Sequence, residues 1–363
     1  MTSRNLSSAL LVLAAVSLIS GIVPPVASGT SHVSEVIAKI GSLGKKEREA
    51  FLVEGAKKEG AVMWYGSVVV DEGIRIIKAF GSRYPSIKAD YYLATRYRLV
   101  TKVLSEWRGK NYVADVIGSV IFQGFEFLEH EGLVQPYLSP ERVHYNPKYY
   151  PKDGSWYTYL MLVTGLAYNT NLVKSGEVPK TYEDLLHPKW KGKLLFDTGS
   201  EYLLAAFEDA WGKERAVQYM RKLAAQKPTL HSRRPLEIQL VGAGEFPVVV
   251  DINVNNVIPL REQGAPIGVK LLRPTVAKPH ALFLVKNSPH PHAAILFHDW
   301  MLSAEGQKVW SQLGHSSARK DVPSPYKELQ VDYDFVLRPD NYANRHAKER
   351  YTREFREIFG LPN

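Results

Sequence analysis

The chain has 363 residues, of which 45% are apolar and 23% are charged, and it contains no cysteine. These fractions exclude a disordered chain, a collagen-like chain and a disulfide-held scaffold. The formal net charge is +9 at pH 7. Because the basic residues are interspersed with acidic ones and form no groove-reading motif, we expect no nucleic-acid partner. A spread positive charge of this kind can still attract a small anion.

The N-terminal segment predicts export. Arg4 is the only charged residue ahead of an apolar stretch at residues 9–26, which ends near two prolines and is followed by small residues. This layout is typical of a secretory signal peptide over residues 1–28, with cleavage near Ser28. The uninterrupted apolar run is too short for a transmembrane helix. Because a chain without cysteine has neither disulfides nor a lipid-modified cysteine, we expect a soluble periplasmic protein.

The first part of the mature chain alternates between helical and strand-like apolar patterns. Residues 45–58 show a polar helical pattern that stops at Gly60, and residues 61–65 form a short apolar run between two glycines. The next segments are a helix at 71–84, a strand at 87–93, a helix at 96–107 and a strand at 114–117. This order predicts a parallel sheet with helices on both faces.

A second α/β unit follows a proline-rich and tyrosine-rich stretch at residues 140–155. Its predicted strands are 159–168, 193–196 and 246–252, and its predicted helices are 202–211, 213–225 and 236–242. A strand at 281–285 and one long amphipathic helix at 291–313 come next, and residues 344–359 predict a surface helix.

Two α/β units in one chain predict two lobes with a ligand cleft between them. We expect hinges at residues 159–163 and 266–272. The predicted organisation is a signal peptide at 1–28, the first part of lobe 1 at 29–160, lobe 2 at 161–265, the return to lobe 1 at 266–322 and a C-terminal helical tail at 323–363.

Candidate ligand-binding residues follow from this architecture. In α/β sheets, ligands meet the carboxyl ends of strands and the amino ends of the helices that follow. The residues at such places are Tyr65, Ser67, Thr95, Arg96, Ser119, Thr198 and Ser200. Each of them alone can be an ordinary helix cap. Their recurrence at four strand ends favours one shared ligand cleft.

Two adjacent arginines, Arg233 and Arg234, stand just before the helix predicted at 236–242. Positive charge at a helix amino end is unfavourable unless an anion or a carboxylate lies nearby. Asp251, which follows an apolar strand together with Asn253, can orient these arginines or coordinate a cation. His280 precedes a buried strand, and a lone histidine in this position is more often structural than a ligand-binding residue.

Enzymatic chemistry has no positive support in the sequence. The motifs G-x-S-x-G, H-E-x-x-H, G-x-x-x-x-G-K and G-x-G-x-x-G are all missing. His290 and His292 lack partners at metal-ligand spacing and more plausibly begin a helix. We therefore expect a binding protein without a cofactor rather than an enzyme.

Several short motifs carry a family resemblance. They are residues 59–67 (EGAVMWYGS), 114–116 (ADV), 166–169 (LAYN), 190–193 (WKGK), 244–249 (GEFPVV) and 304–307 (AEGQ). In order and spacing, the segment 50–313 resembles the periplasmic solute-binding proteins of ABC importers, in particular the ferric-iron-binding type. The resemblance implies a two-lobed type II fold with two crossover strands, a ligand clamped between the lobes, and docking on a permease in the inner membrane. We expect a monomer.

One departure from that family bears on the ligand. Members that bind ferric iron directly carry two adjacent tyrosines, and the corresponding positions here are Val254 and Asn255. Neither side chain supplies a phenolate. The expected ligand is a small anion (an oxyanion, a phosphonate or an organic acid) or an anion-chelated ferric ion carried as cargo. The first alternative is a ligand-sensing subunit of a membrane receptor. A periplasmic enzyme on the same scaffold is the second alternative and is less favoured.

Overall fold

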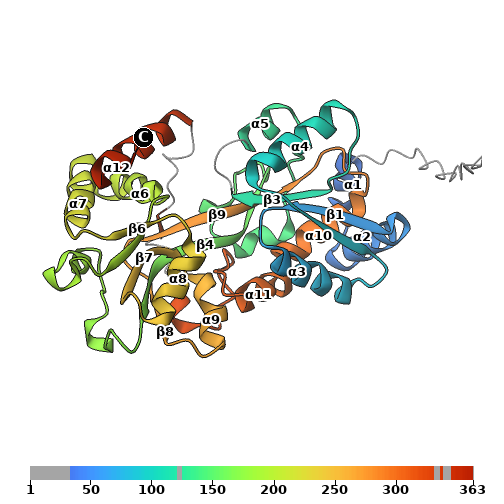
Figure 1. Cartoon of the computed structure of the whole chain (residues 1–363). Coiled ribbons are helices and arrows are strands. Elements are labelled where there is room, and N and C mark those ends of the chain that lie inside the picture. The colour runs from blue at the N-terminus through green and yellow to red at the C-terminus, as the bar shows by residue number, and fades with distance from the viewer. Residues whose placement is uncertain (1–32, 121–124, 331–335, 338–344, 363) are drawn as a thin grey trace, which may run out of the picture. The chain divides into compact units, whose positions relative to one another are not determined.

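The computed structural model describes residues 33–120, 125–330, 336–337 and 345–362. The signal peptide predicted at residues 1–28 lies outside these ranges. Within them, no helix combines the length and the apolar character that crossing a membrane requires. Helices and strands alternate along the described chain and build a mixed α/β architecture around one ten-stranded sheet (Figure 1).

The first half of the fold is a parallel sheet with helices on both faces, as the sequence predicts. Strand β1 lies between β2 and β3 and runs parallel to both. Gly60 ends α2 with a φ of 75°, a left-handed conformation that glycine adopts readily. The elements are α1 Val33–Ile40, α2 Lys45–Glu59, β1 Ala61–Gly66, α3 Val70–Arg83, β2 Lys88–Leu93, α4 Arg96–Arg108, β3 Val116–Val120 and α5 Phe125–His130.

The second half repeats the pattern. Strand β5 lies between β6 and β7, again with all strands parallel. Of these strands, the short β6 has no counterpart in the sequence prediction. The elements are β5 Leu194–Asp197, α6 Glu201–Trp211, α7 Lys213–Ala225, β6 Thr229–His231, α8 Arg234–Ala243, β7 Val248–Asn253 and α9 Ile258–Glu262.

Two long strands, β4 (Tyr157–Asn169) and β9 (Thr275–Leu284), join the halves. They pair antiparallel with each other, while β9 also pairs with β3 and β4 also pairs with β7. The strand order is β2-β1-β3-β9-β4-β7-β5-β6, with β8 (Ile267–Lys270) paired to β4 and β10 (Val336–Leu337) paired to β9. The sheet is therefore mixed overall, and β4 and β9 are its two crossover strands (Figure 1).

The segment expected to form the second hinge, residues 266–272, is mostly a strand. Most of the segment 266–272 forms β8, which pairs with the second-half end of β4, from Leu166 to Asn169. The chain returns to the first half only afterwards, through β9. The sequence pattern missed this because β9 is a continuous run of ten buried or half-buried residues, and the strand predicted at 281–285 covers only its last four.

The single helix predicted at 291–313 is wrong. The structure has two helices, α10 (Pro291–Leu302) and α11 (Ala304–Gln312), separated by Ser303. The Ser303 side chain accepts a hydrogen bond from the backbone N–H of Gly306 at 3.2 Å, so that Ser303 caps α11. Serine at such a position starts a new helix even where the apolar pattern continues.

The C-terminal helix α12 (Arg345–Phe359) is more than a surface helix. Its Tyr351 and Phe355 are each 1% exposed and belong to the apolar core of the second half. Arg350 pairs with Glu208 of α6 through two hydrogen bonds of 3.0 and 3.2 Å. Together these contacts fasten α12 to α6 and thereby extend the core of the second half.

Candidate functional site

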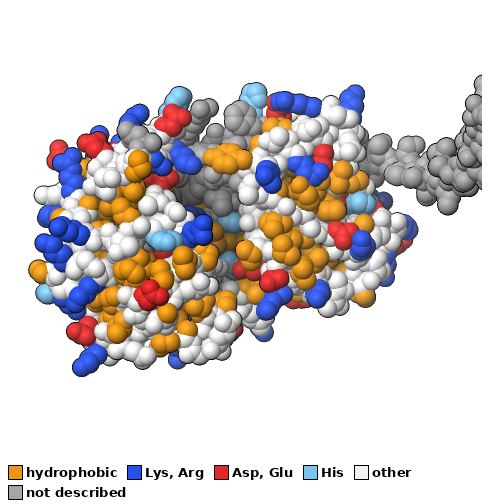
Figure 2. All heavy atoms as spheres, viewed as in Figure 1, with side chains coloured by type: hydrophobic (Ala, Val, Ile, Leu, Met, Phe, Trp, Pro, Cys, Tyr) orange, Lys and Arg blue, Asp and Glu red, His pale blue; other side chains and the backbone are white. Residues whose placement is uncertain are grey.

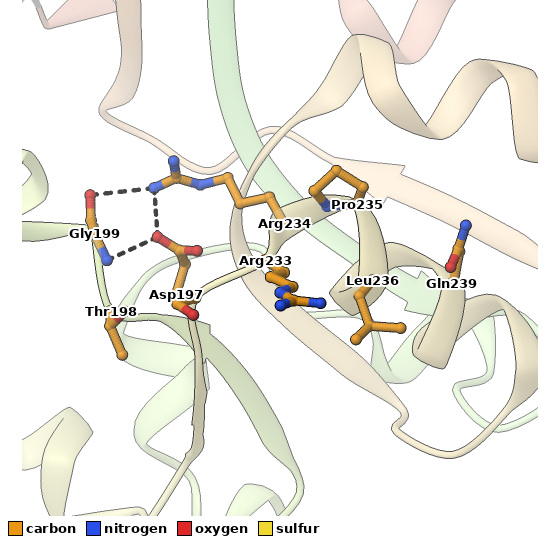
Figure 3. Close-up of a pocket in the computed structure, with 9 residues that line it drawn as sticks. Asp197, Thr198, Gly199, Arg233, Arg234, Pro235, Leu236 and Gln239 are labelled. Carbon is orange, nitrogen blue, oxygen red and sulfur yellow. Dashed lines mark hydrogen bonds and ion pairs between the residues drawn. The ribbon is translucent and has the colours of Figure 1, made fainter. Parts of the chain in front are cut away.

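A hollow of about 860 Å³ lies in the second half of the fold, where β5 and β6 end and α8 begins (Figure 3). Because β5 and β6 are parallel and pair Asp197 with His231, the loops after them meet at the same edge of the sheet. The residues that line the hollow are Asp197, Thr198, Gly199, Ser232, Arg233, Arg234, Pro235, Leu236 and Gln239. Three of the predicted site residues are among them.

The side chains of the two adjacent arginines have different environments. Arg234 is turned toward Asp197 and Gly199 (Figure 3), with its Nη2 atom 2.9 Å from Asp197 Oδ1 and 3.2 Å from the Gly199 carbonyl oxygen. The Arg233 side chain is exposed, and no ion pair of the described residues includes it. Arg234 is thus held within the protein, whereas Arg233 is available to a ligand.

Asp251 contacts Arg234, Ser200 and Tyr202 in the interior of the protein next to the hollow. Its side chain is fully buried and accepts hydrogen bonds from the hydroxyls of Ser200 and Tyr202, and its Oδ2 atom lies 3.5 Å from Arg234 Nη2. The backbone of Asp251 has a φ of 64°, which is uncommon for a residue other than glycine. Of the two roles predicted for Asp251, the geometry favours orienting Arg234 over binding a cation.

Lys278, on the crossover strand β9, is a member of the same cluster that the sequence analysis did not single out. Its Nζ atom lies 3.3 Å from the Tyr202 hydroxyl and 4.3 Å from the centre of the Tyr202 ring. Burial, followed by the charge of Arg234, lowers the pKa of Lys278 to about 8. A lysine within a mostly apolar strand was the available signal.

Glu237, on α8, was also missed. Its side chain is fully buried, and its Oε1 atom lies 3.9 Å from Nδ1 of His231. Burial, followed by the negative charge of Asp197, raises the pKa of Glu237 to about 8. The Glu237 carboxyl is therefore protonated at neutral pH. Its place four residues after Arg233, on the buried face of α8, was the only hint in the sequence.

These protonation states determine the charge of the buried cluster that Arg234 and Asp197 connect to the hollow. With Glu237 neutral, the cations Arg234 and Lys278 balance the carboxylates of Asp197 and Asp251. Burial opposes the charge on Arg234, but Tyr202, Asp251 and Asp197 raise its pKa, so that it stays a cation. Arg233 then remains as an uncompensated positive charge at the rim. An electrostatic arrangement of this kind favours an anion.

The first half of the fold contributes a pair of hydroxyls. Ser67, just after β1, and Ser119, near the end of β3, lie side by side with their Oγ atoms 2.9 Å apart. Thr95 precedes α4, is exposed, and makes no side-chain capping hydrogen bond. Arg96 is the first residue of α4, and its side chain lies outside the described part of the structure.

The contacts of Tyr65 and His280 indicate structural roles. The Tyr65 hydroxyl donates a 2.9 Å hydrogen bond to Glu106 of α4, and its ring is buried in the apolar core beneath that helix. Burial, followed by the hydrogen bond to Glu106, raises the pKa of Tyr65, so no phenolate forms there at neutral pH. His280, on β9, is 3% exposed, with Nδ1 3.5 Å from the Tyr159 hydroxyl.

The remaining predicted residues lie near the hollow or at the end of β7. Thr198 lines the hollow, and its backbone N–H donates to the His231 carbonyl at 2.7 Å. Asn253 ends β7 and is half-buried, and its Oδ1 atom has no hydrogen-bond partner among the described residues. Val254 and Asn255, at the positions of the family's paired tyrosines, are buried in a short 3₁₀ helix.

The described residues contain no cluster of metal-binding side chains. No group of three or more His, Asp or Glu residues among them is arranged to hold a metal ion. On the face shown in Figure 2, Lys and Arg side chains are scattered among acidic and apolar ones, as the composition indicates.

Comparison with known proteins places the chain in a family. A sequence profile described as "Bacterial extracellular solute-binding protein" matches residues 111–338. Iron uptake protein A1 of Synechocystis sp. is 27% identical over 234 residues, which are 59% of this chain and 63% of that protein. The match thus spans less than two thirds of that relative.

Solved structures support the fold. An iron- and citrate-bound protein of Trichodesmium superposes with a TM-score of 0.68 at 21% identity, covering 82% of this chain and 99% of the other. The periplasmic binding protein AfuA of Actinobacillus pleuropneumoniae, with fructose-6-phosphate bound, gives 0.62 at 22% identity, covering 84% and 99%. The chain belongs to the bacterial extracellular solute-binding proteins and has their two-lobed type II fold.

Proposed function

We propose that this protein is exported to the periplasm, captures a small anionic solute at the hollow beside α8, and delivers it to an ABC importer. The observation that carries the proposal is the division between the two arginines. Arg234 is compensated by Asp197 and Asp251, whereas Arg233 is exposed at the rim and forms no ion pair with a carboxylate of the described residues. An anion that enters the hollow supplies the missing negative charge.

In this proposal, closure of the two lobes about β4 and β9 completes the site. Closure brings the hydroxyl pair Ser67 and Ser119 onto the ligand and excludes water, which strengthens the contact with Arg233. Reopening on the permease then releases the solute. The protein acts as a monomer, and the solute is cargo rather than a cofactor.

An anion-chelated ferric ion is the second candidate. It is favoured by the relative whose name is an iron uptake protein and by the neighbour whose structure holds iron together with citrate. Val254 and Asn255 offer no phenolate to a bare ferric ion, so an iron complex would enter through its anionic chelator. Arg233 would then contact the chelator.

A thermal-shift panel with phosphate, sulfate, citrate, ferric citrate and ferric chloride tests the proposal. A ligand present at one hundred times its Kd stabilises the folded state by about 2.7 kcal/mol. We expect at least one anion to raise the Tm of the wild type, Arg233→Gln to lose that response, and Arg221→Gln, at an exposed position of α7, to keep it. An anion response that survives in Arg233→Gln would count against this site.

A further inference from the structure

An exposed apolar surface lies in the first half of the fold, at the carboxyl ends of β1 and β2. Among the described residues, nine large apolar side chains are exposed, and six of them fall between positions 69 and 97. We refer to these six as the β1–β2 patch: Val69, Val70, Ile74, Tyr92, Leu93 and Tyr97. In Figure 2, apolar side chains gather on the face that lies between α3 and α4 in Figure 1.

The backbone beneath the patch is held firmly. Gly66 and Leu93 are opposite each other in the parallel pair, and the Ala94 N–H continues the ladder with a 3.0 Å hydrogen bond to the Gly66 carbonyl. The Tyr91 hydroxyl donates a 2.6 Å hydrogen bond to the Val68 carbonyl. These bonds tie the segment between β1 and α3 to the end of β2, so the backbone next to the patch is held in a fixed position.

Tyr91 is itself locked in place by a glycine. A Cβ atom at Gly73 of α3 would lie 2.2 Å from the Tyr91 ring, so only glycine leaves room for the ring at this point. The Tyr91 ring also packs against Trp64, with ring centres 4.4 Å apart. Gly73 and Trp64 thus fix the Tyr91 ring beside the patch. The apolar side chains of the patch remain at the surface.

The patch adjoins the hydroxyl pair of the candidate site. Ser67 follows Gly66 directly and precedes Val69 by two residues, and its Oγ atom lies 2.9 Å from that of Ser119. A contiguous exposed apolar surface beside a few polar groups is typical of a ligand-binding wall. Inorganic oxyanions and bare metal ions have no apolar part that such a wall would contact.

We propose that the ligand is an organic anion with an apolar body, which packs on the β1–β2 patch while the anionic group meets Arg233. The inference rests on the proposed function and narrows its ligand class. Ser67 and Ser119 then contact a polar group between the two ends of the ligand. Apolar surface that the ligand removes from water contributes to binding in proportion to its area, before the losses of association.

Matched pairs of anions test the inference. Isothermal titration of the full mature chain compares phenylphosphonate with methylphosphonate, and benzoate with acetate. The members of each pair share the anionic group and differ in apolar area. We expect the aromatic member to bind at least about tenfold more tightly, a difference of roughly 1.4 kcal/mol.

Two variants identify the surface responsible. Leu93→Ser and Val69→Ser remove apolar side chains that are 42% and 62% exposed, so both variants should fold normally. We expect each to bring the ratio of aromatic to small-anion affinities toward one. Leu172→Ser, at an equally exposed position in the second half, should leave the ratio unchanged.

The outcomes separate the two proposals. Equal affinities within both pairs, or a preference that Leu93→Ser and Val69→Ser leave intact, would overturn the inference while the anion site stands. If none of the four anions binds the wild type, the anion site fails together with the inference.

Discussion

The Nη2 atom of Arg234 lies 3.5 Å from Oδ2 of Asp251, which itself has a left-handed backbone with a φ of 64°. Ser200 and Tyr202 donate hydrogen bonds to the same carboxylate, so this backbone conformation is supported from three sides. Such backbone conformations persist where the surroundings overdetermine them, often at functional sites. Asp251 fixes the position of Arg234 and, through the start of α8, that of Arg233.

Replacing Asp251 tests this arrangement. Asp251→Asn removes the negative charge beneath Arg234 but keeps the side-chain volume. Since breaking a buried ion pair leaves an uncompensated charge, we expect the free energy of unfolding to fall by on the order of 3 kcal/mol. Urea unfolding followed by circular dichroism measures the change. Asp209→Asn, at an exposed position of α6, is the control, and a loss of equal size in both variants would refute the role.

Glu237 predicts a pH-dependent stability. Its pKa is raised from an ordinary value near 4.5 to about 8 in the folded state by burial, then by Asp197. A raised pKa means that the folded state favours the protonated form, so its contribution is complete below the unfolded-state pKa and is lost as pH rises toward 8. The other charged groups around Glu237 are Arg234, Asp251 and His231.

The variant Glu237→Gln, which stays neutral at every pH, isolates this effect. We expect it to match the wild type near pH 4.5 and to be more stable at pH 8, by on the order of 4 kcal/mol, because each pKa unit corresponds to about 1.4 kcal/mol. Denaturant titrations at both pH values provide the comparison. A constant difference across this range would show that Glu237 ionises normally in the folded protein.

Binding should depend on pH in the opposite sense for anions and for bare cations. Above pH 8, Glu237 gains a negative charge and Lys278, which faces Tyr202, Arg234, Asp251, Asp197 and Glu201, loses a positive one. Both changes make the hollow more negative. We expect the affinity for an anion of constant charge, such as sulfate, to fall about tenfold between pH 7 and pH 9.

Calorimetric titration at the two pH values checks this expectation. Glu237→Gln removes one of the two charge changes, so its affinity should vary less with pH than that of the wild type. An anion affinity that is constant, or that rises with pH, would contradict the assignment of the charged cluster to the ligand site.

The local pattern of apolar residues was sufficient to predict most of the elements. The apolar run at residues 61–65, between two glycines, predicted β1, and the run at residues 246–252 predicted β7. The pattern failed at Ser303, where a capping hydrogen bond divides one apolar repeat into two helices. It also failed at β9, because apolar runs do not reveal which distant strands they pair with.

Two of the family motifs, residues 114–116 and 166–169, position backbone elements. Asp115 accepts hydrogen bonds from the Met63 N–H at 2.6 Å and from Ser288 at 2.5 Å, which joins β1 to the segment before α10. Asn169 donates to the Val241 carbonyl at 2.8 Å and so fixes the end of α8. The family resemblance therefore predicted the fold more directly than it predicted the ligand-binding residues.

The candidate site was only partly accessible to sequence reasoning. Arg233 and Arg234 stood out because a helix start disfavours positive charge, and among the described residues only Arg234 of the two has a carboxylate partner. Lys278 lies on β9, far from the arginines in the sequence. Glu237 lies on the buried side of α8, the helix that begins at Arg234. Their altered pKa values arise from tertiary burial, which no local pattern encodes.

The central claim is that the protein binds its cargo through an anionic group. Native mass spectrometry of protein exported to the periplasm and purified without unfolding tests it directly, because a retained ligand adds its own mass. We predict a mass increment that corresponds to an organic anion, alone or together with iron, and its loss in Arg233→Gln. An increment of a single ferric ion with no anion, retained in that variant, would contradict the claim.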